Sequence, residues 1–192
     1  MSQFQRGNLK NQMEHNMEEK MPELVLHDDN TFVDTKIILI TSDEVEFTLT
    51  YRQSQLVELV KNALEHEENP SGEVKINVLS ESRVFCHVLN WLVYHDGTAP
   101  KEIEKPIAHN ATMHDVCEMD WDADFIDNIG SDRNMLKELM LAANYLNIPS
   151  LLELCCAKMA TLIHKMTPNE MCAEFGTDTV DEKKEQPIDY TT

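Results

Sequence analysis

The sequence predicts an α+β fold, in which a small three-stranded sheet with interleaved helices is followed by a run of C-terminal helices. Two β-branched runs near residue 40, and a third alternating run further along the chain, predict the sheet. The helices are predicted because the apolar residues recur at helical spacing from about residue 120 onward. With 192 residues and 42% apolar side chains, the chain is long enough for one domain with a core of its own.

The predicted sheet begins with a hairpin. KIILIT (36–41) is apolar and β-branched, VEFTLT (45–50) alternates, and three polar residues between them form a short turn. SQLVELVKNALEH (54–66) carries its apolar residues on one helical face, and Ser54 is the expected N-cap. VKINVL (74–79) alternates again, so we expect it to be the third strand.

A long acidic loop interrupts the predicted domain. Before it, residues 81–94 have helical apolar spacing, with Ser80 as the expected cap. The loop itself covers 96–120, and loops longer than about 12–15 residues are usually functional or disordered. After it, WDADFIDNI (121–129) has the apolar spacing of a short helix.

The next two helices are expected to form a pair. The first begins at a cap, Ser131 or Asp132, and runs to about Asn147. The second begins with Ser150 and Glu153, three residues apart, which is the spacing of a capping box. It should extend to about residue 165.

A last, short helix has clear signals at both ends. Thr167 and Glu170 have capping-box spacing, and Pro168 stands at the first helical position, where its missing N–H does no harm. The helix should end near Phe175, with Gly176 adopting the left-handed conformation that follows many helices.

The predicted organisation therefore has four parts. Residues 1–35 are expected to form a disordered tail, 36–130 the sheet-containing core, 131–176 the C-terminal helices and 177–192 an acidic tail. The chain shows neither the apolar run of a signal peptide nor the ~18 apolar residues of a membrane span. We therefore expect a cytoplasmic or nuclear protein with no membrane association.

Charge restricts the expected partners. The chain has 35 acidic and 16 basic residues and a net charge of −19. Such a polyanion repels nucleic acids and anionic membranes, which are bound mainly through Lys and Arg, so proteins are the expected partners. Acidity that serves only solubility is an equally open interpretation. The five Cys are odd in number, which favours a reducing compartment over a disulfide framework.

The sequence contains no recognisable catalytic motif. Its five Gly form no phosphate-binding loop, and no Gly-x-Ser-x-Gly or His-Glu-x-x-His occurs, so we expect neither an enzyme nor a cofactor. His109, His114 and Cys117 have metal-like spacing, but a solvated loop is the preferred interpretation over a zinc site. Cys155 and Cys156 lie mid-helix among leucines, which favours structural thiols over a thioester-forming nucleophile.

Residues 151–163 carry more apolar side chains than one core-facing stripe requires. A helix that is apolar nearly all round is either buried on both sides or part of an interface. Burial inside a helical core is the simpler interpretation. Because only a short helix and a polar tail follow, an uncovered apolar patch that binds another protein is the alternative.

Six segments of the chain form a recognisable series: KIILITSDEVEFTLT, LVKNAL, VLNWLVYH, WDADFI, LKELMLAANYLNIPSLLELCCAKMATLI and MTPNEMCAEF. Within them, LAANYL, then I-x-x-LL, then TP-x-E is a specific combination. In these segments and their order, over residues 36–176, the chain resembles the Skp family, the adaptors of cullin–F-box (SCF) ubiquitin ligases. The resemblance implies a BTB/POZ-like core and a non-catalytic scaffold.

The resemblance also assigns binding residues. Asn144 and Tyr145 match the pair that contacts the cullin. A second set matches the positions at which family helices hold the F-box of a substrate receptor, and we call it the predicted F-box seat. It consists of Leu152, Cys156, Met159, Ile163, Pro168, Met171 and Phe175.

The chain also departs from the family pattern. Glu44 stands where the family usually has a hairpin Gly, Lys137 stands where it usually has Phe, and 177–192 contains no Trp matching that of the family's last helix. The leading hypothesis is an adaptor that bridges cullin and F-box proteins. The second is a homo-oligomeric BTB-type protein, such as a homodimer, without F-box partners. The third is a metal-binding regulatory protein.

Overall fold

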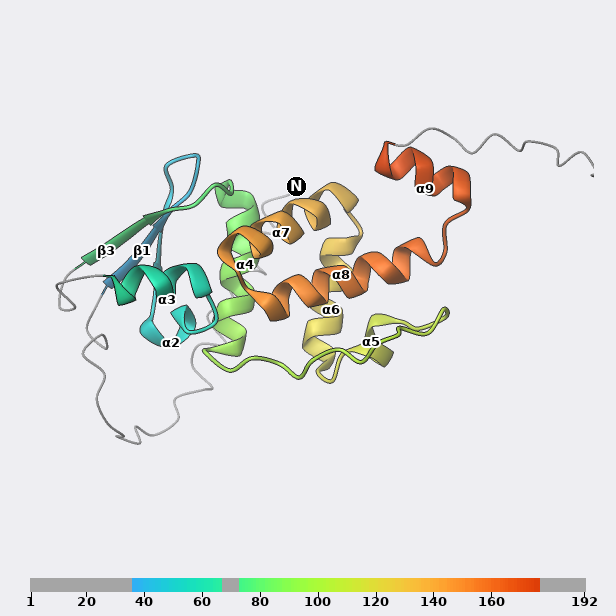
Figure 1. Cartoon of the computed structure of the whole chain (residues 1–192), viewed down its shortest axis with the longest axis horizontal. Helices are drawn as coiled ribbons and strands as arrows, with labels where there is room; N and C mark the ends of the chain where they lie inside the picture. Colours follow the sequence, from blue (N-terminus) through green and yellow to red (C-terminus); the bar gives the residue numbers. More distant parts are fainter. Residues whose placement is uncertain (1–35, 67–72, 177–192) are drawn as a thin grey trace, which may run out of the picture. The chain divides into compact units, whose positions relative to one another are not determined.

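The structure, a computed structural model, describes residues 36–66 and 73–176 (Figure 1). All of them belong to one of the two units into which the chain divides, and the other unit, Met1–Asn30, lies outside the described residues. The predicted tails, 1–35 and 177–192, also lie outside them.

A three-stranded mixed sheet forms as the alternating segments predict. Its strands are β1 (Lys36–Ile40), β2 (Glu46–Leu49) and β3 (Glu73–Asn77). β1 is central, antiparallel to β2 and parallel to β3, so Ile37 lies opposite both Leu49 and Val74. Because β1 is paired on both edges and buries three consecutive side chains, it needs the continuous apolar run that the sequence provides.

The geometry of the β1–β2 turn shows why a glycine would be expected at position 44, where this chain has Glu44. The Thr41 N–H donates to the Val45 carbonyl at 3.0 Å, and the Thr41 hydroxyl accepts from the Val45 N–H at 3.2 Å. This tight turn places Glu44 at φ 63°, in the left-handed region that glycine adopts most easily. A Gly at this position is therefore what the turn geometry favours.

The same turn caps the helix that follows the sheet. The Asp43 carboxylate accepts from the Ser82 N–H at 2.8 Å and from the Ser82 hydroxyl. These bonds lower the pKa of Asp43 from 3.8 to about 2, and the Ser82 hydroxyl is the largest cause. Helix α4 (Ser82–His95) begins after Glu81, so the prediction of Ser80 as its N-cap is wrong.

Between β2 and β3 the predicted helix 54–66 begins later than expected, and a short helix that was not predicted precedes it. The two helices are α2 (Tyr51–Ser54) and α3 (Glu58–Glu65). Ser54 is not an N-cap but the last residue of α2, where its hydroxyl donates to the Tyr51 carbonyl at 2.7 Å. The N-cap of α3 is Val57, which has an extended backbone and is fully buried in the core.

The remaining helices follow the sequence closely, apart from one addition. They are α5 (Met113–Val116), α6 (Asp120–Gly130), α7 (Arg133–Leu146), α8 (Pro149–Ile163) and α9 (Pro168–Phe175). The unpredicted α5 lies inside the acidic loop and buries Met113 against the core. Asp132 caps α7 by accepting from the N–H groups of Asn134 and Met135, as the sequence predicts.

Glu153 fastens the acidic loop to α8. Its carboxylate accepts from the Ile103 N–H at 3.2 Å and pairs with the Lys105 ammonium at 2.6 Å. The prediction that Glu153 forms a capping box with Ser150 is therefore wrong, and Ile148 is the N-cap of α8 without a side-chain cap. The Glu153 carboxylate therefore bonds to Ile103 and Lys105 of the loop and not to the start of its own helix.

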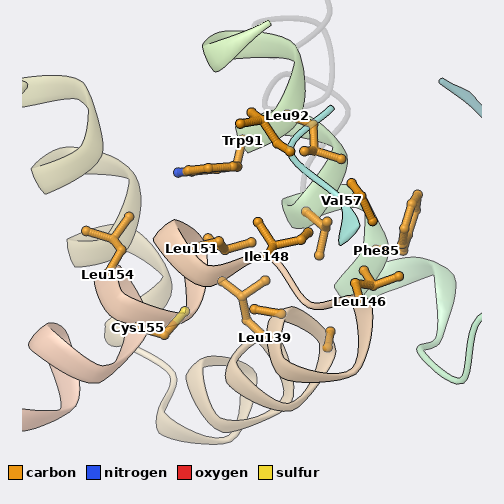
Figure 2. Packing of buried hydrophobic residues seen from close by; sticks show 14 of the residues in the cluster. Val57, Phe85, Trp91, Leu92, Leu139, Leu146, Ile148, Leu151, Leu154 and Cys155 are labelled. Atoms are coloured by element: carbon orange, nitrogen blue, oxygen red, sulfur yellow. The ribbon is translucent and has the colours of Figure 1, made fainter. Parts of the chain in front are cut away.

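The core joins the sheet to the C-terminal helices. Phe85 and Trp91 of α4 are fully buried, together with Leu139, Leu146 and Leu151 from the α7–α8 pair (Figure 2). The arrangement confirms the predicted α+β class. None of the helices in the described residues is long and apolar enough to span a bilayer.

One buried polar pair accompanies this core. His95 of α4 and Asp122 of α6 are both buried, with 2.9 Å between Nε2 and Oδ1. Tyr94 and Trp121 stack beside them with 3.8 Å between ring centroids. A hydrogen-bonded partner is what makes burial of two such groups tolerable, so the pair ties α4 to α6.

Candidate protein-binding site

The turn between α7 and α8 fixes the direction of both helices. Asn147 adopts a left-handed conformation with φ 52°, and the Ile148 N–H donates to the Ala143 carbonyl at 2.9 Å. This bond spans five residues, as in a Schellman motif, and Ile148 is fully buried. The Asn147 carbonyl also accepts from the Glu58 N–H at 3.2 Å, which anchors the turn to α3.

The end of α7 presents a small outward surface. Asn144 is exposed and Tyr145 is 38% exposed, so both residues of the expected cullin pair face solvent. Leu141, four residues before Tyr145, lies on the same side of the helix and is 68% exposed. We call Leu141, Asn144 and Tyr145 the α7 end surface.

Leu141 was not among the predicted site residues, although the sequence carried a signal for it. The core-facing residues of α7 follow the helical period through Leu136, Leu139, Ala143 and Leu146, and all four are buried. Leu141 is out of phase with them. An apolar residue out of phase with the buried stripe indicates an outward-facing side chain, and Leu141 lies next to the expected cullin pair.

The two faces of α8 answer the question of its surplus apolar residues. Leu151, Leu154 and Cys155 point into the core (Figure 2), and burial raises the pKa of the Cys155 thiol to about 12. On another side, Leu152 is half-buried and Cys156 is exposed. One face of α8 therefore fills the core, as the simpler interpretation predicts, and the other face is left partly uncovered.

The α8 residues of the predicted F-box seat share one helical stripe. Leu152, Cys156, Met159 and Ile163 follow one another at intervals of three and four residues. Leu152 and Ile163 are half-buried, but Met159 is only 8% exposed. The structure therefore places most of the Met159 side chain inside the molecule and leaves the other three accessible.

The α9 residues of the seat form a second stripe. Thr167 accepts from the Glu170 N–H, and the Glu170 side chain bonds back to Thr167, so the predicted capping box is confirmed. Pro168, Met171 and Phe175 are spaced for one face, and Phe175 is 49% exposed. None of the residues of α9 is buried.

Three charged side chains connect α9 to α7. The Glu174 carboxylate pairs with Lys137 at 2.6 Å and with Arg133 at 2.9 Å, and these bonds, Lys137 first, lower its pKa. The Lys137 ammonium also donates to the Glu174 carbonyl at 3.2 Å and lies 5.7 Å from the centroid of the Phe175 ring. We call Arg133, Lys137 and Glu174 the α9 clamp.

The structure does not bring the metal-like residues together. The His109 ring lies beside His164, at 5.2 Å between centroids, whereas His114 pairs with Asp120 at 3.1 Å. Burial raises the pKa of the Cys117 thiol to about 11, which disfavours the thiolate that a metal would need. Among residues 36–66 and 73–176, no cluster of three or more His, Cys, Asp or Glu side chains could hold a metal ion.

The chain is similar to a family model and to several curated relatives. The model described as Skp1 family, dimerisation domain, matches residues 149–186. The E3 ubiquitin ligase complex SCF subunit sconC of Arthroderma otae is 32% identical over 154 residues, which are 79% of this chain and 90% of the relative.

Relatives from distant organisms agree. The S-phase kinase-associated protein 1 homolog of Tetrahymena thermophila is 34% identical over 74% of this chain and 82% of its own length. The SKP1-like protein 1A of Arabidopsis thaliana is 31% identical over 79% of this chain and 91% of its own length. With this identity over most of both partners in each comparison, the chain belongs to the Skp1 family.

Proposed function

We propose that this chain is a non-catalytic adaptor of an SCF-type E3 ubiquitin ligase, which bridges a cullin scaffold to F-box substrate receptors in ubiquitin-dependent protein degradation. Relatives that cover most of the chain are named as subunits of such a complex. The observation that carries the proposal is the apolar face of α8 and α9 that the described residues leave partly uncovered, with Phe175 half exposed at its end.

The seat has the chemistry of a helix-binding surface. Its stripes on α8 and α9 offer aliphatic, thioether and aromatic groups and no charged residue. Covering the half-exposed side chains of Leu152, Ile163 and Phe175 contributes roughly 1 kcal/mol each at 25 cal/mol per Å². Met171 is flexible and adapts its shape to a partner, which suits an adaptor that receives several receptors.

The α7 end surface offers a second, separate contact. It combines an exposed leucine, an amide and a tyrosine, and tyrosine is enriched where interface residues contribute most to affinity. It adjoins the start of α8, whereas the seat runs along α8 from Leu152 to α9, and the 15 residues of α8 span about 22 Å. The two surfaces use different residues, and the α9 end of the seat lies about the length of α8 away from the α7 end surface, which supports simultaneous binding of a cullin and an F-box.

Co-purification with a cullin N-terminal domain and a panel of F-box segments tests the proposal. Tyr145→Lys introduces a charge at the α7 end surface, and we expect it to weaken cullin capture by at least about tenfold. Capture of the F-box segments should stay at the wild-type level. Leu79→Lys is the matched control, because it places the same charge on an exposed apolar residue of another part of the chain.

Two results contradict the assignment. If Tyr145→Lys captures every cullin tested as well as the wild type does, the α7 end surface is not the cullin contact. If the wild-type chain captures no F-box segment and forms a stable dimer by light scattering, the homo-oligomeric alternative replaces the adaptor.

We also expect the adaptor in the cytoplasm, the nucleus or both, which fluorescence microscopy of the tagged chain would check.

A further inference from the structure

Helix α9 has well-defined ends but no apolar anchor. A complete capping box begins it, and Gly176, with φ 64°, ends it. Yet it has only eight residues, and none of their side chains is buried. Isolated helices this short are marginal in water, so contacts outside the helix have to hold it in place. Figure 1 shows α9 following a short turn at the end of α8.

The α9 clamp provides such contacts. The Glu174 side chain is only 15% exposed, although it is charged and belongs to a helix that buries nothing. It is covered by Lys137 and Arg133, whose charged groups reach from the first half of α7 to the last turn of α9. The second bond of Lys137, to the Glu174 carbonyl, places a cation at the carboxyl end of α9, where the helix dipole favours positive charge.

We propose that the α9 clamp holds α9 against α7 in the free chain, and that Lys137 thereby acts as a positioning residue for the predicted F-box seat. The second part rests on the proposed function. Glu174 is the neighbour of Phe175, and the Lys137 ammonium lies over that aromatic ring. The bonds from Lys137 to Glu174 therefore also fix the position of Phe175, a residue of the seat.

Preorganisation is the physical effect of the clamp. A partner that requires one particular position of α9 has an affinity proportional to the fraction of molecules in which α9 has that position. In this chain ionic contacts hold the last turn of α9, a helix whose residues are not buried. Ionic contacts between partly exposed groups are screened by salt, so the placement of α9 becomes dependent on ionic strength.

The test uses the full chain with Lys137→Gln, the conservative Lys137→Arg and the control Lys165→Gln. Lys165 is exposed, lies close in sequence to α9, and makes no ion pair with the described residues, so its variant removes the same charge without touching the clamp. Two quantities are measured: amide hydrogen exchange of residues 168–176 in the free chain, and affinity for the F-box segments that the wild type captures.

The clamp predicts a specific pattern. Lys137→Gln should speed exchange in α9 by about 3–10-fold and weaken F-box affinity by about 2–5-fold, as expected for losing contacts of this kind. Lys137→Arg should retain most of both, and Lys165→Gln should behave as the wild type. Raising the salt concentration from about 50 to 500 mM should speed exchange in the wild type, and speed it less in Lys137→Gln, where only the pair of Arg133 with Glu174 remains to be screened.

Results that differ from this pattern contradict either the clamp or the positioning role of Lys137. Unchanged exchange in Lys137→Gln shows that the clamp does not hold α9. Faster exchange with unchanged affinity shows that Lys137 does not position the seat. If the wild type captures no F-box segment, the proposed function and the positioning role both fail, while hydrogen exchange still decides whether the clamp holds the helix.

Discussion

Helices α8 and α9 both begin with a proline in the first turn, and both carry residues of the predicted F-box seat, but they are held in different ways. α8 buries six residues, and among them Leu151 and Cys155 are completely enclosed (Figure 2). α9 buries none and is joined to α7 through the paired charges of Glu174. One helix is part of the core, and the other lies on its edge.

The difference shows how stability is distributed along a binding surface. Local opening of a protein is easiest where few apolar contacts are made, and binding elements are often drawn from that end of the range. We therefore expect the α8 half of the seat, whose helix buries six residues, to open as rarely as the core behind it. We expect the α9 half to open more often, because partly exposed ion pairs contribute much less than buried side chains.

Removing one buried side chain from α8 should have the largest effect. Leu151→Ala deletes a fully buried leucine in the contact between α8 and the rest of the core, and we expect it to lower the free energy of unfolding by about 2–5 kcal/mol. Phe175→Ala in α9 removes a larger but half-exposed side chain and should change this quantity by about 0.5 kcal/mol or less. Urea denaturation followed by circular dichroism measures both.

The pair of variants tests the comparison directly. If Phe175→Ala destabilises the chain as strongly as Leu151→Ala does, α9 is integrated into the core and the distinction between the two helices fails. Leu152→Ala, next to Leu151 on the half-buried side of α8, should give an intermediate loss.

Removing the cap of α9 should have a smaller and local effect. Thr167→Ala deletes the hydroxyl that bonds the Glu170 N–H, and caps of this kind stabilise a helix by about 1 kcal/mol. We expect faster amide exchange confined to residues 168–176, with the midpoint of urea denaturation unchanged. Thr167→Ser retains the hydroxyl and is the matched control. A shift of the global midpoint equal to the local effect would show that α9 unfolds together with the core.

The elements that local sequence determines were predicted well. Alternation in the strands, the cap Asp132 and the capping box of α9 depend on residues within a few positions of one another. Two of the failures arise from contacts that no local pattern contains. Glu153 bonds to a loop about fifty residues away in sequence instead of capping its own helix, and Val57, at the start of α3, is buried in the core.

The candidate site shows the same division. The resemblance to the family assigned the seat residues, and the structure keeps most of them accessible, but neither the resemblance nor helical spacing revealed that Met159 is mostly buried. The α9 clamp joins residues 37 positions apart, from α7 to α9. No local pattern contains such a pair. Leu141 is the exception, because its position outside the buried period was readable from the sequence.

Lowering the pH should affect α9 more than α8, and we expect this effect to be the smallest of those predicted. Hydrogen bonds from Lys137 and then Arg133 hold the pKa of Glu174 below its ordinary value of 4.5, and the bonded Thr167 backbone does the same for Glu170. A depressed pKa in the folded state means that the carboxylate stabilises the fold above about pH 4.5. That contribution is lost as the pH falls below this value and the folded-state carboxylate takes up a proton.

Between pH 6 and pH 3 we therefore expect the NMR amide signals of residues 168–176 to move towards unstructured positions. Signals of 151–159 should keep their folded positions over the same range, because apolar contacts that do not titrate hold this part of α8, and protonation of Glu153 should disturb only its bonds to the acidic loop. Glu174→Gln is the control, since it removes the main acid-sensitive bond to α7 and should loosen α9 already at pH 6. Simultaneous loss of both sets of signals at one pH would instead show that a single cooperative unit includes α9, and the contrast between the two helices would then be one of burial alone and not of stability.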